Sequence, residues 1–212
     1  MRDLKFIYYN KLILLSPSIY SKLKFVLDIF IALLGLILSL PLMLFSAFAI
    51  KISSKGPVFF KQERLGLNKV PFTLIKFRTM IDNAEKDTGP KWASKNDPRI
   101  TKVGKFLRKT RLDELPQLFN VLKGDMSFVG PRPIRQHFAD LLSKEIPNYN
   151  LRFSVKPGIT GWAQVMGDYA GSVEKQKDKF EYDLYYILNK SIWLDLFIIF
   201  KTIRTVLLFK GQ

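Results

Sequence analysis

An apolar segment from Phe25 to Ile50 constrains the fold of this chain more than any other feature, because it carries a single charge, Asp28. A helix that crosses the hydrocarbon core of a bilayer needs about 20 apolar residues, and this segment is longer. A cleaved signal peptide fits poorly, since the apolar stretch is too long and no small-residue cleavage site follows before Lys51. The segment therefore predicts a membrane-embedded helix.

Basic residues flank both ends of the apolar segment: Lys22, Lys24, Lys51, Lys55, Lys61 and Arg64. Lys and Arg favour the cytoplasmic side of a membrane, so one straight pass would leave one basic flank on the opposite side. Pro41 would kink a helix, and Ser39 could bond a backbone carbonyl that the proline leaves free. A re-entrant helix that breaks at Ser39 and Pro41 explains both observations. A kinked single-pass helix is the alternative.

The charge balance of the whole chain implies an anionic partner. The sequence has 34 Lys and Arg against 18 Asp and Glu, a formal net charge of +16. Charge alone leaves open nucleic acid, anionic lipid and a phosphorylated substrate. The absence of Cys excludes disulfides, thiolate metal sites and a cysteine nucleophile, and a single histidine, His137, excludes a histidine-rich metal site. His137 itself fits an ordinary surface or packing role.

The pattern along the chain predicts an α/β fold that is mostly helical. We expect a basic interfacial segment at 1–24, the membrane helix at 25–50 and one compact domain at 51–212. Within the domain we expect strands at 57–61 and 71–78 around a turn at 66–69, a polar loop at 82–98, helices at 102–119 and 140–150, and a glycine-rich turn region at 157–171. The first of these helices pauses near Pro116. The stretch 175–209 favours an amphipathic helix in the membrane interface.

Two adjacent carboxylates, Asp113 and Glu114, are the candidate catalytic and metal-binding residues. On a helix their side chains diverge by about 100°, so they share one metal ion more easily than they act as a stacked acid and base. Mg²⁺ commonly uses one or two carboxylates together with substrate phosphates and water. A carboxylate can also attack phosphorus covalently. Alternatively, Thr110 caps a helix and Asp113 stabilises its first turn.

Cations lie close to this acidic pair in the sequence: Arg108, Arg111, Lys123 and Arg132. Arg binds phosphate oxygens in a bidentate fork, and the run Gly-Pro-Arg-Pro at 130–133 would fix the backbone around Arg132. Lys76 and Arg78 could line the same pocket or face water. A solvated basic surface is the alternative for each of these residues.

Four runs of sequence resemble a known family. They are Gly-Pro-Val-Phe-Phe-Lys-Gln-Glu-Arg-Leu-Gly at 56–66, Lys-Phe-Arg-Thr-Met at 76–80, the run from Leu112 to Pro133, and Lys-Pro-Gly-Ile-Thr-Gly-Trp-Ala-Gln-Val at 156–165. Together they closely resemble the bacterial sugar transferase family, the monotopic phosphoglycosyl transferases that begin the assembly of surface glycans. The resemblance covers roughly residues 20 to 208, in the family's order.

The resemblance implies transfer of a phosphosugar from a UDP-sugar to undecaprenyl phosphate, with release of UMP. It implies that Asp113 is the nucleophile of a covalent phosphosugar intermediate and that Glu114 is its acidic partner at Mg²⁺. Arg108 and Arg132 match residues that hold phosphate groups. The family's re-entrant helix matches the apolar segment, with Pro41 at the break.

Further expectations follow from the same resemblance. Substrate-binding candidates within the matched runs are Lys76, Arg78 and Gln164. The implied setting is the cytoplasmic face of the bacterial inner membrane, with interfacial amphipathic helices, membrane lipids as partners and no nucleic acid. Downstream glycosyltransferases would take up the product for exopolysaccharide, capsule, O-antigen or glycoprotein glycan.

The sequence departs from the family pattern in two places, and the residues alone keep two other functions open. Leu40 stands directly before Pro41, where many members have Ser, and Met-Gly-Asp at 166–168 stands where many read Asn-Gly-Arg. A membrane-bound metal-dependent phosphodiesterase or phosphatase would use similar residues with water as the acceptor. A non-enzymatic basic membrane adaptor would explain the charge and the anchor, but not the acidic pair.

Overall fold

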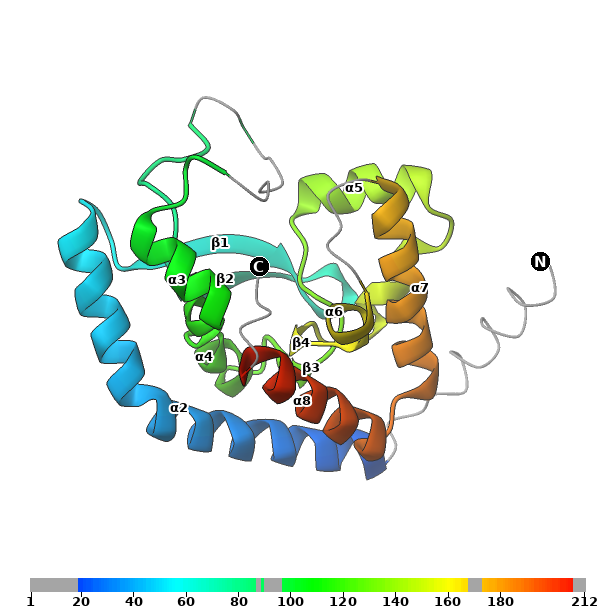
Figure 1. Cartoon of the computed structure of the whole chain (residues 1–212). Helices are drawn as coiled ribbons and strands as arrows, with labels where there is room; N and C mark the ends of the chain where they lie inside the picture. Colours follow the sequence, from blue (N-terminus) through cyan, green and yellow to red (C-terminus); the bar gives the residue numbers. More distant parts are fainter. Residues whose placement is uncertain (1–18, 87–88, 90–96, 168–172, 208–212) are drawn as a thin grey trace.

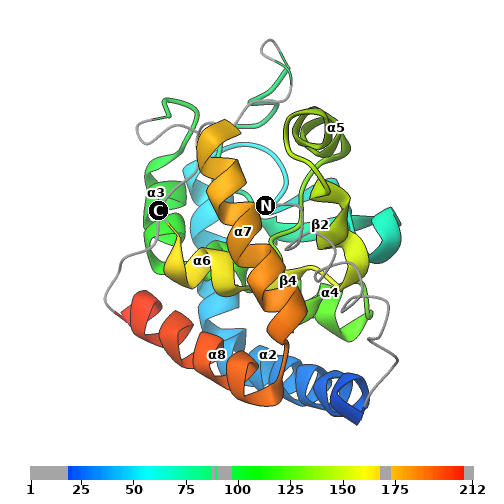
Figure 2. The same ribbon diagram turned by 90° about the vertical axis from the view of Figure 1, so that its right-hand side faces the viewer.

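The computed structural model describes residues 19–86, 89, 97–167 and 173–207, so most of the predicted 1–24 segment lies outside the described residues. A long helix, α2, lies along one side of a compact body of short helices and two small sheets (Figures 1 and 2). The α-helices are α2 (Ile19–Ser53), α3 (Lys102–Thr110), α4 (Gln117–Leu122), α5 (Gln136–Glu145), α6 (Trp162–Met166), α7 (Val173–Asn189) and α8 (Ile192–Leu207). The 3₁₀ turns are η1 (Leu67–Lys69), η2 (Leu112–Glu114) and η3 (Tyr149–Ser154).

Helix α2 is long and apolar enough to be inserted in a membrane. Its mean hydropathy reaches 2.5, and large apolar side chains such as Phe30, Ile37 and Phe45 are exposed on its outer face. The helix continues through Pro41 instead of ending there, and Figure 1 shows that its axis turns a corner partway along. A proline removes one backbone hydrogen bond and bends a helix in this way. The predicted bend is therefore present. The predicted break at Ser39 and Pro41 is not, because one continuous helix runs through both residues.

The expected hydrogen bond from Ser39 is also not formed. Ser39 is buried, and among the described residues its hydroxyl has no hydrogen-bond partner. The prediction that this hydroxyl satisfies a carbonyl freed by Pro41 is therefore wrong. The Ser39 side chain lies on the buried side of α2, whereas Leu40 and Pro41 are exposed.

A polar cluster ties the first turns of α2 to the body. Asp28 accepts a hydrogen bond from the backbone N–H of Phe128 at 3.0 Å. Lys24 donates to Asp195 at 2.9 Å, and the hydroxyl of Tyr186 donates to the other oxygen of Asp195 at 2.8 Å. The single charge of the apolar segment is therefore buried and hydrogen-bonded, as a buried carboxylate must be if its cost is to be offset.

The predicted hairpin is confirmed, but its first strand lies later in the sequence than the expected 57–61: β1 (Phe59–Leu65) pairs antiparallel with β2 (Pro71–Phe77) around η1. Asn120 of α4 is fully buried and holds this hairpin in place. Its side-chain oxygen accepts from the N–H of Ile75 at 3.0 Å, and its amide donates to the carbonyl of Thr73 at 2.7 Å. Because β2 is fixed against α4, the hairpin face that continues into the site has a defined position.

A second, parallel sheet of two strands was not predicted. It joins β3 (Ser127–Val129) to β4 (Gly158–Thr160). The backbones approach closely here: a Cβ on Gly130 would lie 2.4 Å from the carbonyl oxygen of Lys156. Any side chain at Gly130 would collide with this carbonyl, so a glycine is needed there. The close approach packs the run that ends at Pro133 against the run at 156–165.

The helical region predicted at 102–119 is divided at Arg111, earlier than the pause expected at Pro116. Thr101 caps α3 by accepting from the N–H of Gly104 at 2.9 Å, and Arg111, with φ 61°, ends the helix in the left-handed conformation. Thr110 is the last residue of α3, and its hydroxyl donates to the carbonyl of Phe106. Thr110 therefore does not cap a following helix, and that explanation of Asp113 is wrong.

The other predicted helices differ in extent. The helix expected at 140–150 begins at Gln136 and ends at Glu145. The amphipathic helix expected at 175–209 is two helices, of which α7 buries Phe180 and Ile187 in the body. On α8, Trp193, Phe197 and Phe200 form an exposed apolar stripe, and Trp193 is 82% exposed. The amphipathic character is thus confirmed for α8, up to Leu207.

Candidate active site

A cavity of about 250 Å³ lies where the hairpin, η2 and the loop before α5 meet. Its lining is rich in cations and contains the acidic pair: Phe60, Gln62, Arg64, Lys76, Met80, Glu85, Arg99, Arg108, Arg111, Asp113, Glu114, Arg132, Arg135 and Phe138. An excess of arginines over carboxylates in an enclosed space favours a ligand with several negative charges.

Asp113 lies in η2, between the left-handed Arg111 and Pro116. Its side chain is buried, and within the described part of the chain one carboxylate oxygen, Oδ1, has no hydrogen-bond partner. Burial and the negative charge of Glu114 raise the pKa of Asp113 to about 6, against the opposing charges of Lys76, Arg108 and Arg132. Asp113 is thus a poorly solvated carboxylate, ionised at neutral pH, with an oxygen free to react or to bind a ligand.

Glu114 is held by arginines. Arg132 donates to it at 2.6 Å and Arg111 at 3.2 Å. Burial acts to raise the pKa of Glu114, but the charge and hydrogen bond of Arg132, together with the charge of Arg111, outweigh it and lower the pKa to about 2. The side chain of Arg132 is 47% exposed, so this ion pair faces the open side of the cavity. The two neighbouring carboxylates therefore differ: Glu114 is ionised and held by arginines, whereas Asp113 has a raised pKa and an oxygen without a partner in the described residues.

Two further predicted cations reach the same cavity. Lys76 on β2 lies over the ring of Phe60 on β1, at 5.1 Å from the ring centre. Burial lowers the pKa of Lys76 to about 8, even though the charge of Asp113 acts to raise it. Arg108, in the last turn of α3, donates from Nε to the hydroxyl of Thr79 at 2.9 Å.

The structure brings together five of the seven residues predicted to act in catalysis or substrate binding: Asp113, Glu114, Arg108, Arg132 and Lys76. Arg78 and Gln164 lie outside the cavity lining. Arg78 is buried and donates to the carbonyls of Ser54 and Lys55, which ties the end of α2 to the hairpin. The Gln164 amide donates to the carbonyl of Ile159 at 3.1 Å. Asp168, one of the departures from the family pattern, lies outside the described residues.

Sequence reasoning did not assign several of the lining residues to the site. Phe60, Gln62 and Arg64 alternate along β1 on one face, and Lys76 is the cross-strand partner of Phe60. Since side chains alternate between the two faces of a strand, this spacing was a signal that could have placed them with Lys76. Arg135 forms an ion pair with Glu85 at 2.9 Å, and both residues line the cavity. The two residues are far apart in the sequence, so this contact could not be predicted from local patterns.

The donor set suits a metal ion that takes part of its coordination from a substrate. In the part of the chain that the structure describes, no group of three or more His, Cys, Asp or Glu side chains is arranged to hold a metal. The free oxygen of Asp113 and the adjacent Glu114 provide two carboxylates, which matches the small number of protein ligands that Mg²⁺ commonly uses with phosphates and water.

The site is therefore a buried carboxylate pair in a cavity lined by arginines, in a chain that also carries an exposed apolar helix. Residues 19–209 match the model of the bacterial sugar transferase family. The chain belongs to this family, as the four sequence runs indicated.

Over the aligned regions, relatives in several bacteria are 45–50% identical to this chain. A UDP-N-acetylgalactosamine-undecaprenyl-phosphate N-acetylgalactosaminephosphotransferase of Aeromonas hydrophila is 50% identical over 199 residues, 93% of this chain and 47% of the relative. A UDP-glucose:undecaprenyl-phosphate glucose-1-phosphate transferase of Klebsiella pneumoniae is 50% identical over 87% of this chain and 39% of the relative. The chain thus spans less than half the length of these two relatives. An uncharacterized sugar transferase of Bacillus subtilis, EpsL, is 45% identical, with 89% of both chains covered.

Proposed function

We propose that this protein transfers a sugar 1-phosphate from a UDP-sugar to undecaprenyl phosphate and so begins the synthesis of a bacterial surface glycan. The observation that carries the proposal is the buried Asp113 oxygen that has no partner within the described residues, at a cavity lined by Lys76, Arg108 and Arg132. A carboxylate with a free oxygen amid cations is suited to attack a phosphorus atom whose charge those cations neutralise.

The proposed reaction has two displacements at one phosphorus atom. A carboxylate oxygen of Asp113 forms a bond to the phosphorus that bears the sugar, and the bond to the bridging oxygen breaks. UMP leaves with that oxygen and the bonding electrons. A phosphate oxygen of the lipid then attacks the same phosphorus, and the Asp113 carboxylate leaves, which yields the polyprenyl diphosphate sugar. No net proton transfer is needed at the acyl phosphate.

The side chains around Asp113 have separate tasks in this scheme. Arg132, fixed by Glu114, would hold phosphate oxygens on the open side of the cavity, and Arg108 and Lys76 would neutralise charge close to Asp113. When bound, Mg²⁺ held by Asp113 and Glu114 would further neutralise the diphosphate. The names of the two transferase relatives support a UDP-sugar donor and undecaprenyl phosphate as the acceptor.

A labelled UDP-sugar tests the proposal when it is mixed with undecaprenyl phosphate and the full chain in detergent. We expect the label to enter the lipid fraction, with one UMP released for each lipid labelled. A membrane phosphodiesterase would instead release the label as a water-soluble sugar phosphate without lipid product. A basic adaptor would bind without turnover, so either of these results would refute the proposal.

We further propose that α2 is re-entrant, with both ends and the compact domain on the cytoplasmic face of the inner membrane. Basic residues at both ends and the bend near Pro41 support this arrangement. The chain has no Cys, so single cysteines introduced at Lys22 and Lys55, both exposed, report each end without background. We expect a membrane-impermeant maleimide to label both only from the cytoplasmic side. Labelling of the two positions from opposite sides would instead support a single-pass helix.

The pH dependence of the reaction should reflect Asp113 and Lys76. The pKa of Asp113, raised to about 6 by burial, requires the activity to fall about tenfold per pH unit below that value, because the nucleophile becomes protonated. The pKa of Lys76, lowered to about 8 by burial, predicts a second decline above it, as Lys76 loses its charge. Rates of UMP release from pH 5 to 10 measure both limbs. Lys76→Arg should keep its charge and move the alkaline decline upward; an unchanged alkaline limb would contradict the role of Lys76.

A further inference from the structure

A second cavity lies away from the acidic pair, at the first turns of α2. It has a volume of about 330 Å³ and is lined by Tyr20, Ser21, Lys24, Phe25, Asp28, Leu67, Ser127, Val129, Ser154, Val155, Lys156, Tyr186 and Lys190. None of these residues lines the cavity around Asp113. The lining combines three lysines with one carboxylate, several hydroxyls and a few apolar side chains, so we call it the lysine cavity.

Two of the three lysines have no ion-pair partner among the residues that the structure describes. Lys24 is paired with Asp195 at 2.9 Å. Across the described ranges, Lys156 and Lys190 have no ion pair, and Lys156 lies over the ring of Phe25 at 5.6 Å from its centre. Burial and the charge of Lys24 lower the pKa of Lys190, which is the expected result of gathering cations without a matching anion.

The carboxylate in the lysine cavity does not supply that anion. Asp28 accepts from the N–H of Phe128 at 3.0 Å, and its nearest cation is Lys24 at 3.9 Å. Asp28 and Asp195 both pair with Lys24, and in the described structure neither pairs with Lys156 or Lys190. A bound anion would satisfy Lys156 and Lys190, and phosphate is the anion best matched to ammonium groups and hydroxyls.

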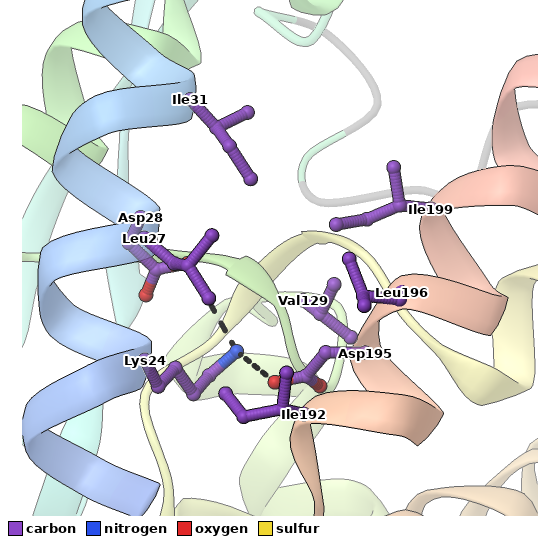
Figure 3. A pocket seen from close by; sticks show the side chains of 9 residues that line it. All are labelled: Lys24, Leu27, Asp28, Ile31, Val129, Ile192, Asp195, Leu196 and Ile199. Atoms are coloured by element: carbon purple, nitrogen blue, oxygen red, sulfur yellow. Dashed lines mark hydrogen bonds and ion pairs between the residues drawn. The ribbon is translucent and has the colours of Figure 1, made fainter.

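An apolar crevice joins the lysine cavity at Lys24, Asp28 and Val129. This crevice, of about 20 Å³, lies between α2 and α8 and is lined on its other sides by Leu27, Ile31, Ile192, Asp195, Leu196 and Ile199. Figure 3 shows the apolar side chains of α2 and α8 extending toward each other, with Lys24 at one end between them. The crevice is too small to enclose a hydrocarbon chain, but its mouth offers apolar edges beside the cationic cavity.

The position of the cavity also matches a lipid surface. Exposed apolar side chains lie on the helix turns that line the cavity or the adjoining crevice: Ile19, Leu23 and Val26 on α2, and Trp193 and Leu196 on α8. Lysines and an aromatic side chain beside such an apolar surface are typical of the headgroup level of a membrane. A lipid could bury its acyl chains against this apolar surface, whereas free phosphate could not, so the surface favours a lipid as the ligand.

We propose that the lysine cavity binds the phosphate headgroup of an anionic phospholipid, with Lys156 and Lys190 on the phosphate and the acyl chains against the exposed apolar side chains of α2 and α8. This site is separate from the proposed transfer reaction. It would fix the depth and orientation of the first turns of α2 in the headgroup layer.

Native mass spectrometry of the full chain released from lipid nanodiscs tests this proposal. The double variant Lys156→Gln, Lys190→Gln is compared with a control that removes two exposed lysines elsewhere, Lys144→Gln and Lys177→Gln. In phosphatidylglycerol nanodiscs, we expect the wild type and the control to retain one more lipid than the double variant. About 1 kcal/mol per lysine corresponds to a loss of retention of about fivefold for one lysine and about thirtyfold for both.

Three further arms identify the source of the phosphate. Phosphatidylcholine, whose headgroup carries its own cation, should be retained no better by the wild type than by the double variant. Displacement of phosphatidylglycerol by millimolar inorganic phosphate would refute a lipid site, and equimolar displacement by undecaprenyl phosphate would assign the cavity to the acceptor instead. Equal retention by the double variant and the wild type would also overturn the proposal.

Discussion

Asp113→Asn is expected to lower the rate of lipid labelling by at least about 10⁴-fold, the scale on which the loss of a covalent nucleophile acts. The amide has almost the same shape but cannot form the acyl phosphate. Incubation of the wild type with labelled UDP-sugar alone should leave label on the protein, and the variant should carry none. Asp178→Asn, an exposed substitution on α7, is the matched control and should retain wild-type rates. Labelling of lipid by Asp113→Asn at the wild-type rate would remove Asp113 as the nucleophile.

The same variant should be more stable than the wild type at pH 8, which separates lost chemistry from lost folding. The pKa of Asp113 is raised to about 6 from an ordinary value of 3.8, so the native state holds its proton more tightly than the unfolded chain does. Stability is therefore lost as pH rises from about 3.8 through about 6, and the full loss persists above that range. Asn carries no charge and avoids this loss. Thermal unfolding should show a higher midpoint for the variant at pH 8 and no difference below pH 4.

Arg132→Ala is expected to reduce kcat/KM for the UDP-sugar by about 10²- to 10³-fold, because it removes a positioned cation from the phosphate site. It also removes the 2.6 Å bond that fixes Glu114, so the pKa of Glu114 should rise from about 2. Arg132→Lys keeps the charge but not the bidentate fork, and its activity should lie between those of the wild type and the alanine variant.

Lys123→Ala is the control for Arg132, because Lys123 is an exposed cation close in sequence that does not line the cavity. Steady-state rates of UMP release at several donor concentrations measure the three variants. If Lys123→Ala costs as much as Arg132→Ala, the effect is one of net charge, and the specific role of Arg132 is contradicted.

Local sequence predicted the features that depend on local rules. The two short strand-like runs at 57–61 and 71–78 around a turn predicted the hairpin, and the long apolar run predicted α2, because both signals lie in neighbouring residues. The acidic pair was identifiable because adjacent carboxylates with several arginines nearby in the sequence suit a site for phosphate and a divalent metal. The bend at Pro41 follows from covalent chemistry alone.

Features that depend on distant contacts were not predictable from the sequence. The pairing of β3 with β4 involves very short strands without alternation, and it depends on the close approach of two backbones at Gly130. Arg111 is a poor candidate for a left-handed residue by type, and its ion pair with Glu114 is part of the fold that holds it there. Arg78 lies in a matched run of sequence, yet its guanidinium bonds the end of α2, a contact that only the folded chain reveals.

Helix α2 contributes buried side chains to the cores of the compact body: Ala32 packs with Leu118, and Met43 and Ile50 pack with Phe77 and Leu107. If α2 is inserted in a membrane, as we propose, its insertion and the folding of the body depend on each other. Because α2 comes earlier in the sequence, it is synthesised before the helices and strands that pack against it. In the proposed membrane setting, an inserted α2 would present its buried face to each later element, and a failure of insertion would leave two of the core clusters incomplete.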